Sequence, residues 1–318
     1  MPRAIGANSR LLMIPEVTYG TAPGGNWRRV PFLSCNLGAE QPLLDADVIG
    51  LGGNRDPAAP FFDIVTVEGD VVVPVDLINI GHWLRLLLGA PTTTGTNPNF
   101  THTFGSGAAT LPSQAIEIGY PDVPSYDVCA GVRADALEID FSPTGPATAT
   151  IKLIAQGSTR SGSSSGGTPV AAAYTAFNKA QGSISRAGSA LAQVTGARLA
   201  YSNSVEAVRT IRADRKIEGA DPGIARATGQ ITARFADTTL LTQAQNGTAA
   251  EFAFAFTIDA NRNITFTLHE VYLALAKTPI EGPAGVEASF EFRAAFNATA
   301  TRMMTAVLKN QQAGTEYA

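Results

Sequence analysis

The side chains that most often carry catalysis or hold metal ions, histidine and cysteine, are scarce in this chain of 318 residues. The histidines are His82, His102 and His269, and the cysteines are Cys35 and Cys129. A metal centre needs several Cys, His or carboxylate ligands at close spacing, and neither His82 nor His269 has such companions. We therefore expect structural histidines, two reduced core cysteines, no metal and no cofactor.

A pair of carboxylates offers a second kind of chemistry. Glu138 and Asp140 are two residues apart in an alternating segment, so their side chains share one face of the predicted strand. Carboxylates placed this way can do acid–base work, but a solvated strand face is the simpler explanation. The chain has no Gly-x-Ser-x-Gly elbow and no P-loop, and "GLGGN" at 50–54 does not match a dinucleotide-binding loop. The sequence therefore predicts a protein that is not an enzyme.

The overall composition favours β structure in one large or two medium domains. Hydrophobic residues make up 45% of the chain and charged residues 16%, while 31 glycines and 19 prolines imply many turns. The net charge of −4 argues against sequence-independent binding of nucleic acid, which needs clustered Lys and Arg. The N-terminus lacks the apolar run of a signal peptide, and no apolar segment is long enough to span a bilayer. We expect a protein that is used without secretion by the general pathway.

A Gly/Ser-rich segment near the middle, "GSTRSGSSSGGTP" at 157–169, is typical of a linker or mobile loop. The sequence on its two sides matches weakly at five places, and the spacing between partners falls steadily from 167 (203 − 36) to 151 (298 − 147). Chance matches would have scattered spacings, so we infer a tandem duplication with a first domain at 1–160, a linker at 161–175 and a second domain at 176–318. The matched pairs are Asn36 with Asn203, Asp56-Pro57 with Asp221-Pro222, Gly69 with Gly229, Gly131-Val132 with Gly285-Val286, and "ATAT" at 147–150 with "ATAT" at 298–301.

Hydrophobic periodicity predicts similar strands in the two halves. Alternating valines at 65–75 predict a strand with one apolar face, and "GQITARF" in the second half has the same alternation. Further alternating segments are "AIEIGY", "DALEIDF" and "TIKLIA" in the first half, and "EFAFAFTI", "NITFTLHEVYLAL" and "ASFEFRAAF" in the second. The repeated "ATAT" is expected to begin a late strand in each half.

One helix is predicted after an early strand in each half. The first covers 77–88, with Asp76 as N-cap and Gly89 as terminator. The second is the shorter segment "TLLTQAQ", preceded by Asp237 or Thr238 and ended by Gly247. The predicted fold is therefore mainly β: two tandem antiparallel barrel or sandwich domains, each with one flanking α-helix and a long loop.

Two segments of the first half resemble a known family. "EVTYGTAPGGNWRRVPFLSCNLG" at 16–38 and "EGDVVVPVDLINIGHWLRLLLG" at 68–89 are similar to the tail tube proteins, or major tail proteins, of long-tailed bacteriophages. The resemblance implies a structural virion protein whose rings stack into a tube for DNA ejection. A duplicated chain is then expected to form a homotrimer that presents a pseudo-hexameric ring. The implied partners are the tape measure, tail terminator and distal tail proteins, with assembly in the host bacterial cytoplasm and no membrane.

Two long polar loops, 40–62 and 206–227, show no internal structure in the sequence, and loops of this length usually have a role. Under the resemblance, they would reach a neighbouring ring and lock the stack. Residues 1–165 hold 15 acidic and 9 basic side chains, against 12 and 14 in residues 166–318. We expect opposite charges to fix register between subunits or rings, although a solvated basic loop is the alternative. The candidates are Asp45, Asp47, Asp56, Arg209, Arg212, Arg215, Lys216 and Asp221.

The resemblance also has a consequence for the lumen of such a tube. DNA should pass without being held, because Lys and Arg contacts to phosphate would retain it. Acidic or neutral polar side chains are therefore expected on the strand faces that line the lumen. The candidates in the first half are Glu68, Asp70, Glu138 and Asp140.

Two other functions are compatible with a β-rich chain. Another tail or baseplate ring component could use the same fold. A carbohydrate-binding adhesin or decoration module would normally show exposed aromatic residues clustered on one face, and the two Trp and seven Tyr of this chain are scattered. The tail tube is the interpretation that the sequence favours.

Overall fold

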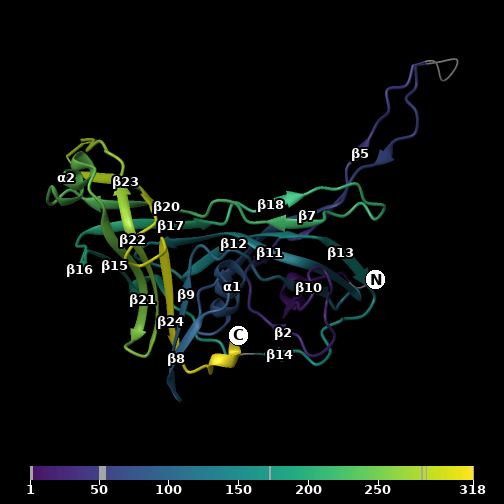
Figure 1. Ribbon diagram of the computed structural model, residues 1–318, viewed down its shortest axis with the longest axis horizontal. Helices are drawn as coiled ribbons and strands as arrows, with labels where there is room; N and C mark the ends of the chain where they lie inside the picture. Colours follow the sequence, from purple (N-terminus) through teal and green to yellow (C-terminus); the bar gives the residue numbers. More distant parts are fainter. Residues whose placement is uncertain (1–2, 50–54, 172, 281, 284, 318) are drawn as a thin grey trace.

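The computed structural model describes residues 3–49, 55–171, 173–280, 282–283 and 285–317 (Figure 1). The protein is mainly β with predominantly antiparallel pairing, as the sequence predicts. The longest strand among the described residues, β11 (Ser125–Phe141), runs through the middle of the molecule and contacts strands of both halves.

The strands of the first half follow one another in a single antiparallel sheet. Their spatial order is β1 (Arg10–Pro15), β10 (Gln114–Tyr120), β11, β12 (Thr148–Ala155), β7 (Thr66–Pro74) and then β3 (Ser34–Cys35) with β4 (Gly38–Glu40). β13 (Gly157–Ser161) pairs with the beginning of β11, and β2 (Arg28–Arg29) joins β1 to β14 (Val170–Ala171). Alternation along β7 buries Val67, Val71 and Val73, which confirms the predicted apolar face.

The second half has the same strand order. It reads β15 (Gly182–Arg186), β21 (Ala250–Asp259), β22 (Arg262–Leu273), β23 (Glu287–Ala294), β20 (Arg226–Arg234) and β17 (Val194–Ser202), with β16 (Ser189–Ala190) beside β15. β24 (Met304–Asn310) pairs with the beginning of β22, as β13 pairs with the beginning of β11. Strand by strand, β7 therefore corresponds to β20, β11 to β22, β12 to β23, and β3–β4 to β17.

The two halves are joined at several places. Ala136–Phe141 of β11 pairs with Ala197–Ser202 of β17, so one sheet runs without interruption across both halves. The hairpin of β8 (Thr92–Thr96) and β9 (Asn99–Gly105) adds to β24 of the second half. In addition, the Tyr317 hydroxyl donates to the carbonyl of Ile78 at 2.9 Å, next to the helix of the first half. The halves also share a hydrophobic cluster, and the division into domains at 1–160 and 176–318 stays a prediction.

The helix α1 (Asn79–Leu88) is buried on nearly all sides, more than the one-sided amphipathic helix that the sequence suggests. The Asp76 carboxylate accepts the backbone N–H of Ile80 at 3.0 Å, so it satisfies a helix N-terminus although the backbone N-cap is Ile78. Gly89 ends the helix at a φ of 93°, as predicted. Burial raises the pKa of the Asp76 carboxyl despite these hydrogen bonds.

The helix α2 (Thr239–Asn246) is shorter and lies on the surface, with Leu240 and Gln243 buried. Asp237 accepts the N–H of Thr239 at 2.8 Å, and Gly247 ends the helix in the left-handed conformation at a φ of 61°, as predicted. Three short 3-10 turns complete the description: Gly6–Asn8, Lys179–Gln181 and Gly314–Glu316.

The matched glycines of the two halves occupy the same place in the fold. A Cβ on Gly69 would lie 2.5 Å from the carbonyl oxygen of Asn36, and a Cβ on Gly229 would lie 1.9 Å from that of Arg198. In both halves, the neighbouring strand therefore approaches too closely for any side chain. This contact makes Arg198, and not Asn203, the structural counterpart of Asn36.

Other sequence matches do not coincide in space. Gly131 lies inside β11, whereas Gly285 precedes β23, which is the counterpart of β12. The first "ATAT" leads into β12, but the second, at 298–301, forms a turn between β23 and β24, so the expectation of a late strand in both halves is wrong. Asn297 explains the turn, because its side chain accepts the backbone N–H groups of Thr299 and Ala300.

The predicted Gly/Ser linker is in part a strand. Residues 157–161 form β13 and pair with Tyr126–Ala130, which a mobile loop would not do. Further along, the Ser164 hydroxyl and the Ser165 N–H each donate to the buried carboxylate of Glu117 at 2.6 Å. Small serines can approach such a group closely, and composition alone does not reveal that partner.

Candidate assembly surfaces

The four predicted lumen residues lie on one face of the continuous sheet. Asp70 is opposite Lys152 on β12, and Glu138 is opposite Thr150 on the same strand. Glu68 and Asp140 share this face because each lies two residues from its partner, and the other face is buried. The structure thus brings the four carboxylates together on a polar face of the first half.

This polar face continues into the second half across the junction. Asp140 is opposite Arg198 on β17, and Arg198 is opposite Gln230 on β20. Arg198 forms an ion pair with Glu138, and Lys179 binds Asp140 at 2.5 Å. We call the whole surface the polar sheet face. Its charged residues include the carboxylates Glu68, Asp70, Glu138, Asp140, Glu287 and Glu291 and the cations Lys152, Arg198, Arg226, Arg234 and Arg293.

The cations of this face were missed by the prediction, which took its candidates from acidic residues of the first half. Two-residue periodicity in "TATIKLIA" would have placed Lys152 beside the predicted carboxylates. The contribution of Arg198 depends on the β11–β17 pairing, which joins residues 60 apart. No short-range pattern predicts that contact.

Both long loops contain a hairpin, which corrects the expectation that they lack internal structure. The first arm, residues 40–62, is built on β5 (Leu43–Leu44) and β6 (Phe61–Phe62). The second arm, residues 206–227, is built on β18 (Glu206–Val208) and β19 (Gly219–Asp221). Strands of two or three residues leave too little alternation to be recognised in sequence.

The second arm lies against the first half of its own chain (Figure 1). The Arg133 guanidinium donates to the carbonyl of Ala220 and lies 3.7 Å from the carboxylate of Asp221. The amide N–H of Val65 donates to the carbonyl of Arg215 at 3.0 Å. The apolar residues packed at this contact, from the arm and from the body of the molecule, are buried: Leu111, Val205, Ile217 and Ala220.

Two of the predicted charged residues of the second arm, Arg212 and Asp221, form ion pairs within the chain. Arg212 binds Asp214 at 2.8 Å and Glu218 at 2.6 Å, and Asp221 pairs with Arg133. The hydrogen bonds with Asp214 and Glu218 raise the pKa of Arg212, and the bond from Arg212 lowers the pKa of Asp214. The role of Arg209, Arg212, Arg215, Lys216 and Asp221 between subunits stays a prediction.

The described part of the first arm, 40–49 and 55–62, projects away from the body of the molecule (Figure 1). It carries the predicted residues Asp45, Asp47 and Asp56, and all three are exposed. The base of the arm is apolar instead of acidic: Leu43 is 58% exposed, Phe61 52% and Phe62 55%. Large apolar side chains gathered on a projecting hairpin are typical of an interaction surface.

The histidines and cysteines have surroundings of a structural kind. His102 is buried between the Thr93 hydroxyl at 2.9 Å and the Asn310 side chain at 3.0 Å, and burial lowers its pKa. His269 contacts the Thr305 hydroxyl at 2.8 Å. Both cysteines are free thiols, and burial raises the pKa of Cys129 to about 12, where it is unreactive.

His82 lies at the contact between α1 and the last described residues. Its Nε2 is 3.4 Å from the carboxylate of Glu316, which also forms an ion pair with Arg28. Burial lowers the pKa of His82, while His82 and then Arg28 lower the pKa of Glu316. The arrangement attaches residues 314–317 to the first half.

The described residues thus form a mainly β fold with one continuous sheet, a polar sheet face and an apolar projecting arm. The chain belongs to the phage tail tube protein family, whose model matches residues 6–294. No curated protein sequence matches it. The resemblance found in the sequence is thereby confirmed, and the protein is a structural component of the phage tail. Neither helix of the described part has the length and apolar character needed to cross a bilayer.

Proposed function

We propose that three copies of the chain close into a ring of six similar units, and that rings stack into the tail tube through which DNA is ejected. The observation that carries this proposal is the β11–β17 junction. Within one chain, it already joins two similar sheets side by side with their polar faces continuous. Repeating such a heterologous contact until the rotation closes produces a ring.

The proposal includes the tandem duplication. It is supported by the common strand order of the halves and by the equivalent positions of Gly69 and Gly229. Two quasi-equivalent units per chain make a trimer sufficient where a single-unit chain would need a hexamer. The partners of the ring would be further rings above and below, and the tape measure, tail terminator and distal tail proteins, with assembly in the host cytoplasm.

The polar sheet face is the proposed lining of the lumen. At least six carboxylates and five cations lie on it, and Arg198, Lys152 and Arg234 each face a carboxylate or lie opposite one. Cations that are neutralised this way hold phosphate weakly, so DNA can slide past. Asp45, Asp47 and Asp56 on one arm, and the charged residues of the other, are proposed to lie between subunits or rings.

Electron microscopy of the purified chain tests the assembly. Rings with threefold symmetry and six lobes, alone or stacked into tubes, are the expected result. A population of discrete monomers at all concentrations would contradict the proposal. A map in which Glu68, Asp70, Glu138 and Asp140 face outward would contradict the assignment of the lumen while leaving the ring intact.

A further inference from the structure

The second arm and the first arm begin at equivalent points of the fold. Phe61 and Asp221 each precede the matched glycine of their half by eight residues (69 − 61 and 229 − 221). In the hairpins, Leu44 is opposite Phe61, and Glu206 is opposite Asp221. The arms are therefore the same structural element, docked in one half and projecting in the other.

The surface that receives the second arm also has an equivalent. In the first half, Gly69 of β7 is opposite Leu153 of β12, which in turn is opposite Ala134 of β11. In the second half, Gly229 of β20 is opposite Phe292 of β23, which in turn is opposite Leu273 of β22. The residues just before Ala134 and Leu273 are Arg133 and Tyr272. Tyr272 of the second half therefore stands where Arg133 stands in the first.

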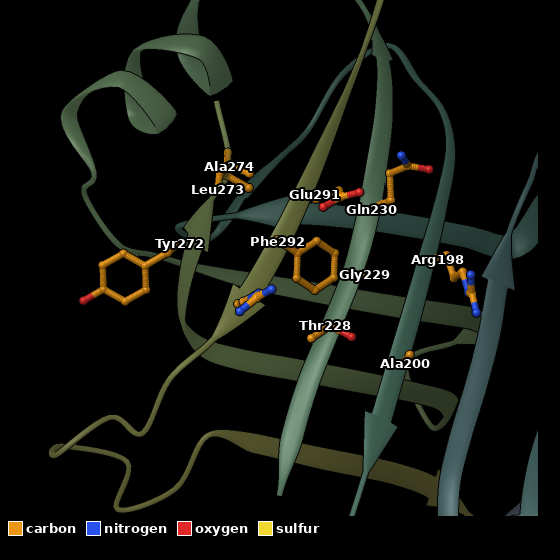
Figure 2. A pocket seen from close by; sticks show the side chains of 11 residues that line it. Arg198, Ala200, Thr228, Gly229, Gln230, Tyr272, Leu273, Ala274, Glu291 and Phe292 are labelled. Atoms are coloured by element: carbon orange, nitrogen blue, oxygen red, sulfur yellow. The ribbon is translucent and has the colours of Figure 1, made fainter. Parts of the chain in front are cut away.

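Arg133 is covered by the second arm, but Tyr272 has no such cover within the described part of the chain. Its side chain is 42% exposed and lies beside an open groove of about 730 Å³, with Arg198 at the opposite side (Figure 2). The groove is lined by β17, β20, β22 and β23. Its end at Tyr272 and Arg293 corresponds to Arg133 and Ile154, the surface that the second arm contacts in the first half. The rest of the groove belongs to the polar sheet face.

The neighbouring sheet edge is open in the same way. Ala274 donates its N–H to the carbonyl of Glu291 at 2.8 Å, so the chain beyond β22 continues beside β23. This continuation, which begins at Ala274, corresponds to Ala136–Phe141 of β11. In the first half, the edge of that stretch away from β12 pairs with β17. Leu137 of that stretch is 3% exposed, whereas its counterpart Leu275 is 67% exposed. The counterpart of β17 is β3–β4, which pairs with β7 along one edge.

We propose that the junction inside the chain is repeated between chains: the first arm of one copy docks at the Tyr272 end of this groove in the next copy, and its β3–β4 edge pairs with residues 274–280 there. The occupant of the groove is thus a second copy of this chain. Both contacts join the first half of one copy to the second half of another, so they act together in one head-to-tail interface. The proposal rests on the proposed ring assembly and names the surface that closes the ring.

The two junctions differ in chemistry at matching positions. Inside the chain, Asp221 meets Arg133, an ionic contact. Between chains, Phe61 would meet Tyr272, an aromatic contact. Exchanging the partners would put Phe61 against a guanidinium or Asp221 against a phenol ring, which leaves a charge without its partner. The difference makes the halves alternate around the ring.

Cysteine cross-linking tests the contact directly. In a Cys35→Ser background, Phe61→Cys and Tyr272→Cys in one chain should give covalent trimers with a short bismaleimide, and either substitution alone should give none. Arg133→Cys with Asp221→Cys, the matched control, should cross-link within one chain and leave its mass unchanged. Rings without trimer cross-links would overturn the proposed contact and leave the ring standing. Cross-linked oligomers that form no ring would support the contact and overturn the ring, whereas monomers that do not cross-link would overturn both.

A charge transplant tests its specificity. Phe61→Asp should lower ring formation at least about tenfold, because an acid would enter the interface without a partner. Adding Tyr272→Arg restores the ionic pair of the internal junction, so the double variant should regain rings. Circular dichroism of each variant checks that the fold is retained. Full ring formation by the folded Phe61→Asp variant, or no recovery in the folded double variant, would overturn the assigned contact.

Discussion

The two halves of the chain share a strand order but differ in how each is filled and covered. The first half buries α1 inside an aliphatic core, with Trp83 1% exposed. The second half has a smaller, peripheral helix and fills its core with phenylalanines, among them Phe252, Phe254 and Phe256. Phe141 of β11 reaches this aromatic group and stacks on Phe256 at 4.6 Å. The same strand order therefore accommodates two different sets of core side chains, because the two helices fill different volumes of the core.

The difference between the arms is of another kind. One arm is buried against its own chain, and the other presents apolar residues to water. A duplication provides an internal contact as well as a free copy of each contacting surface. The contact that the second arm makes within its own chain thus indicates where the first arm is expected to bind on another copy.

Removing a core side chain from each helix should show the largest contrast between the halves. Trp83→Ala should lower the free energy of unfolding by about 3–5 kcal/mol, because a fully buried indole leaves a cavity. Leu240→Ala should cost about 1–2 kcal/mol, since α2 buries little against the second half. Urea unfolding followed by far-UV circular dichroism measures the free energy of unfolding of both variants. Equal losses of stability would contradict the expected difference between the two halves.

The matched glycines should show a smaller contrast. Alanine at Gly69 or Gly229 places a Cβ against a backbone carbonyl, which backbone must shift to accommodate. We expect a loss of about 1–3 kcal/mol at each site, with the larger loss at Gly229, where the approach is 1.9 Å instead of 2.5 Å. Thermal unfolding of the two variants provides the measurement. Gly188→Ala is the control variant. Its φ is positive, but nothing lies within 4 Å of its Cβ position, so it lacks the steric clash with a backbone carbonyl.

Charge reversal in the second arm should affect assembly more than folding. Replacing Arg212, Arg215 and Lys216 by Glu removes the ion pairs with Asp214 and Glu218 and reverses the arm's charge. Tubes should fail to grow while far-UV dichroism stays unchanged. Negative-stain microscopy with tube lengths of normal distribution would speak against a role of these charges between subunits or rings.

The attachment of residues 314–317 to α1 should give the smallest effect. Glu316→Gln is expected to lower stability at pH 7 by about 1 kcal/mol, since the carboxylate loses its charge beside Arg28. The pKa of Glu316 is lowered in the folded state, so its contribution is present above the ordinary carboxyl pKa of 4.5 and is lost as the pH falls below it. Unfolding curves from pH 3 to pH 7 should therefore converge for the two proteins at the acid end, and a constant difference would exclude this linkage.

The sequence was sufficient for those features that depend on local periodicity. The strand of alternating valines, the first helix with Gly89 and the shorter second helix all follow from short patterns, and all are present. The matched Gly69 and Gly229 were found because a close backbone approach permits no other residue. The family resemblance rests on residues 16–38 and 68–89, and the second of these segments contains Gly69 and the first helix.

What escaped prediction depends on contacts between distant residues. The β11–β17 junction and the docking of the second arm pair segments that share no pattern with one another. The "ATAT" at 298–301 has strand-like letters, but Asn297 folds it into a turn. The polar sheet face was found in one half only, because its continuation requires knowledge of which strands are neighbours.

The contact of Tyr317 with Ile78 has a consequence for the timing of synthesis. The two residues are separated by 239 positions, so α1 stays incompletely covered until translation has passed the second half. A nascent first half thus lacks its last layer, including Tyr317, whose side chain is fully buried. Contacts of such long sequence separation form late and slowly. We therefore expect a nascent chain to complete the packing around α1 only after Tyr317 has been synthesised.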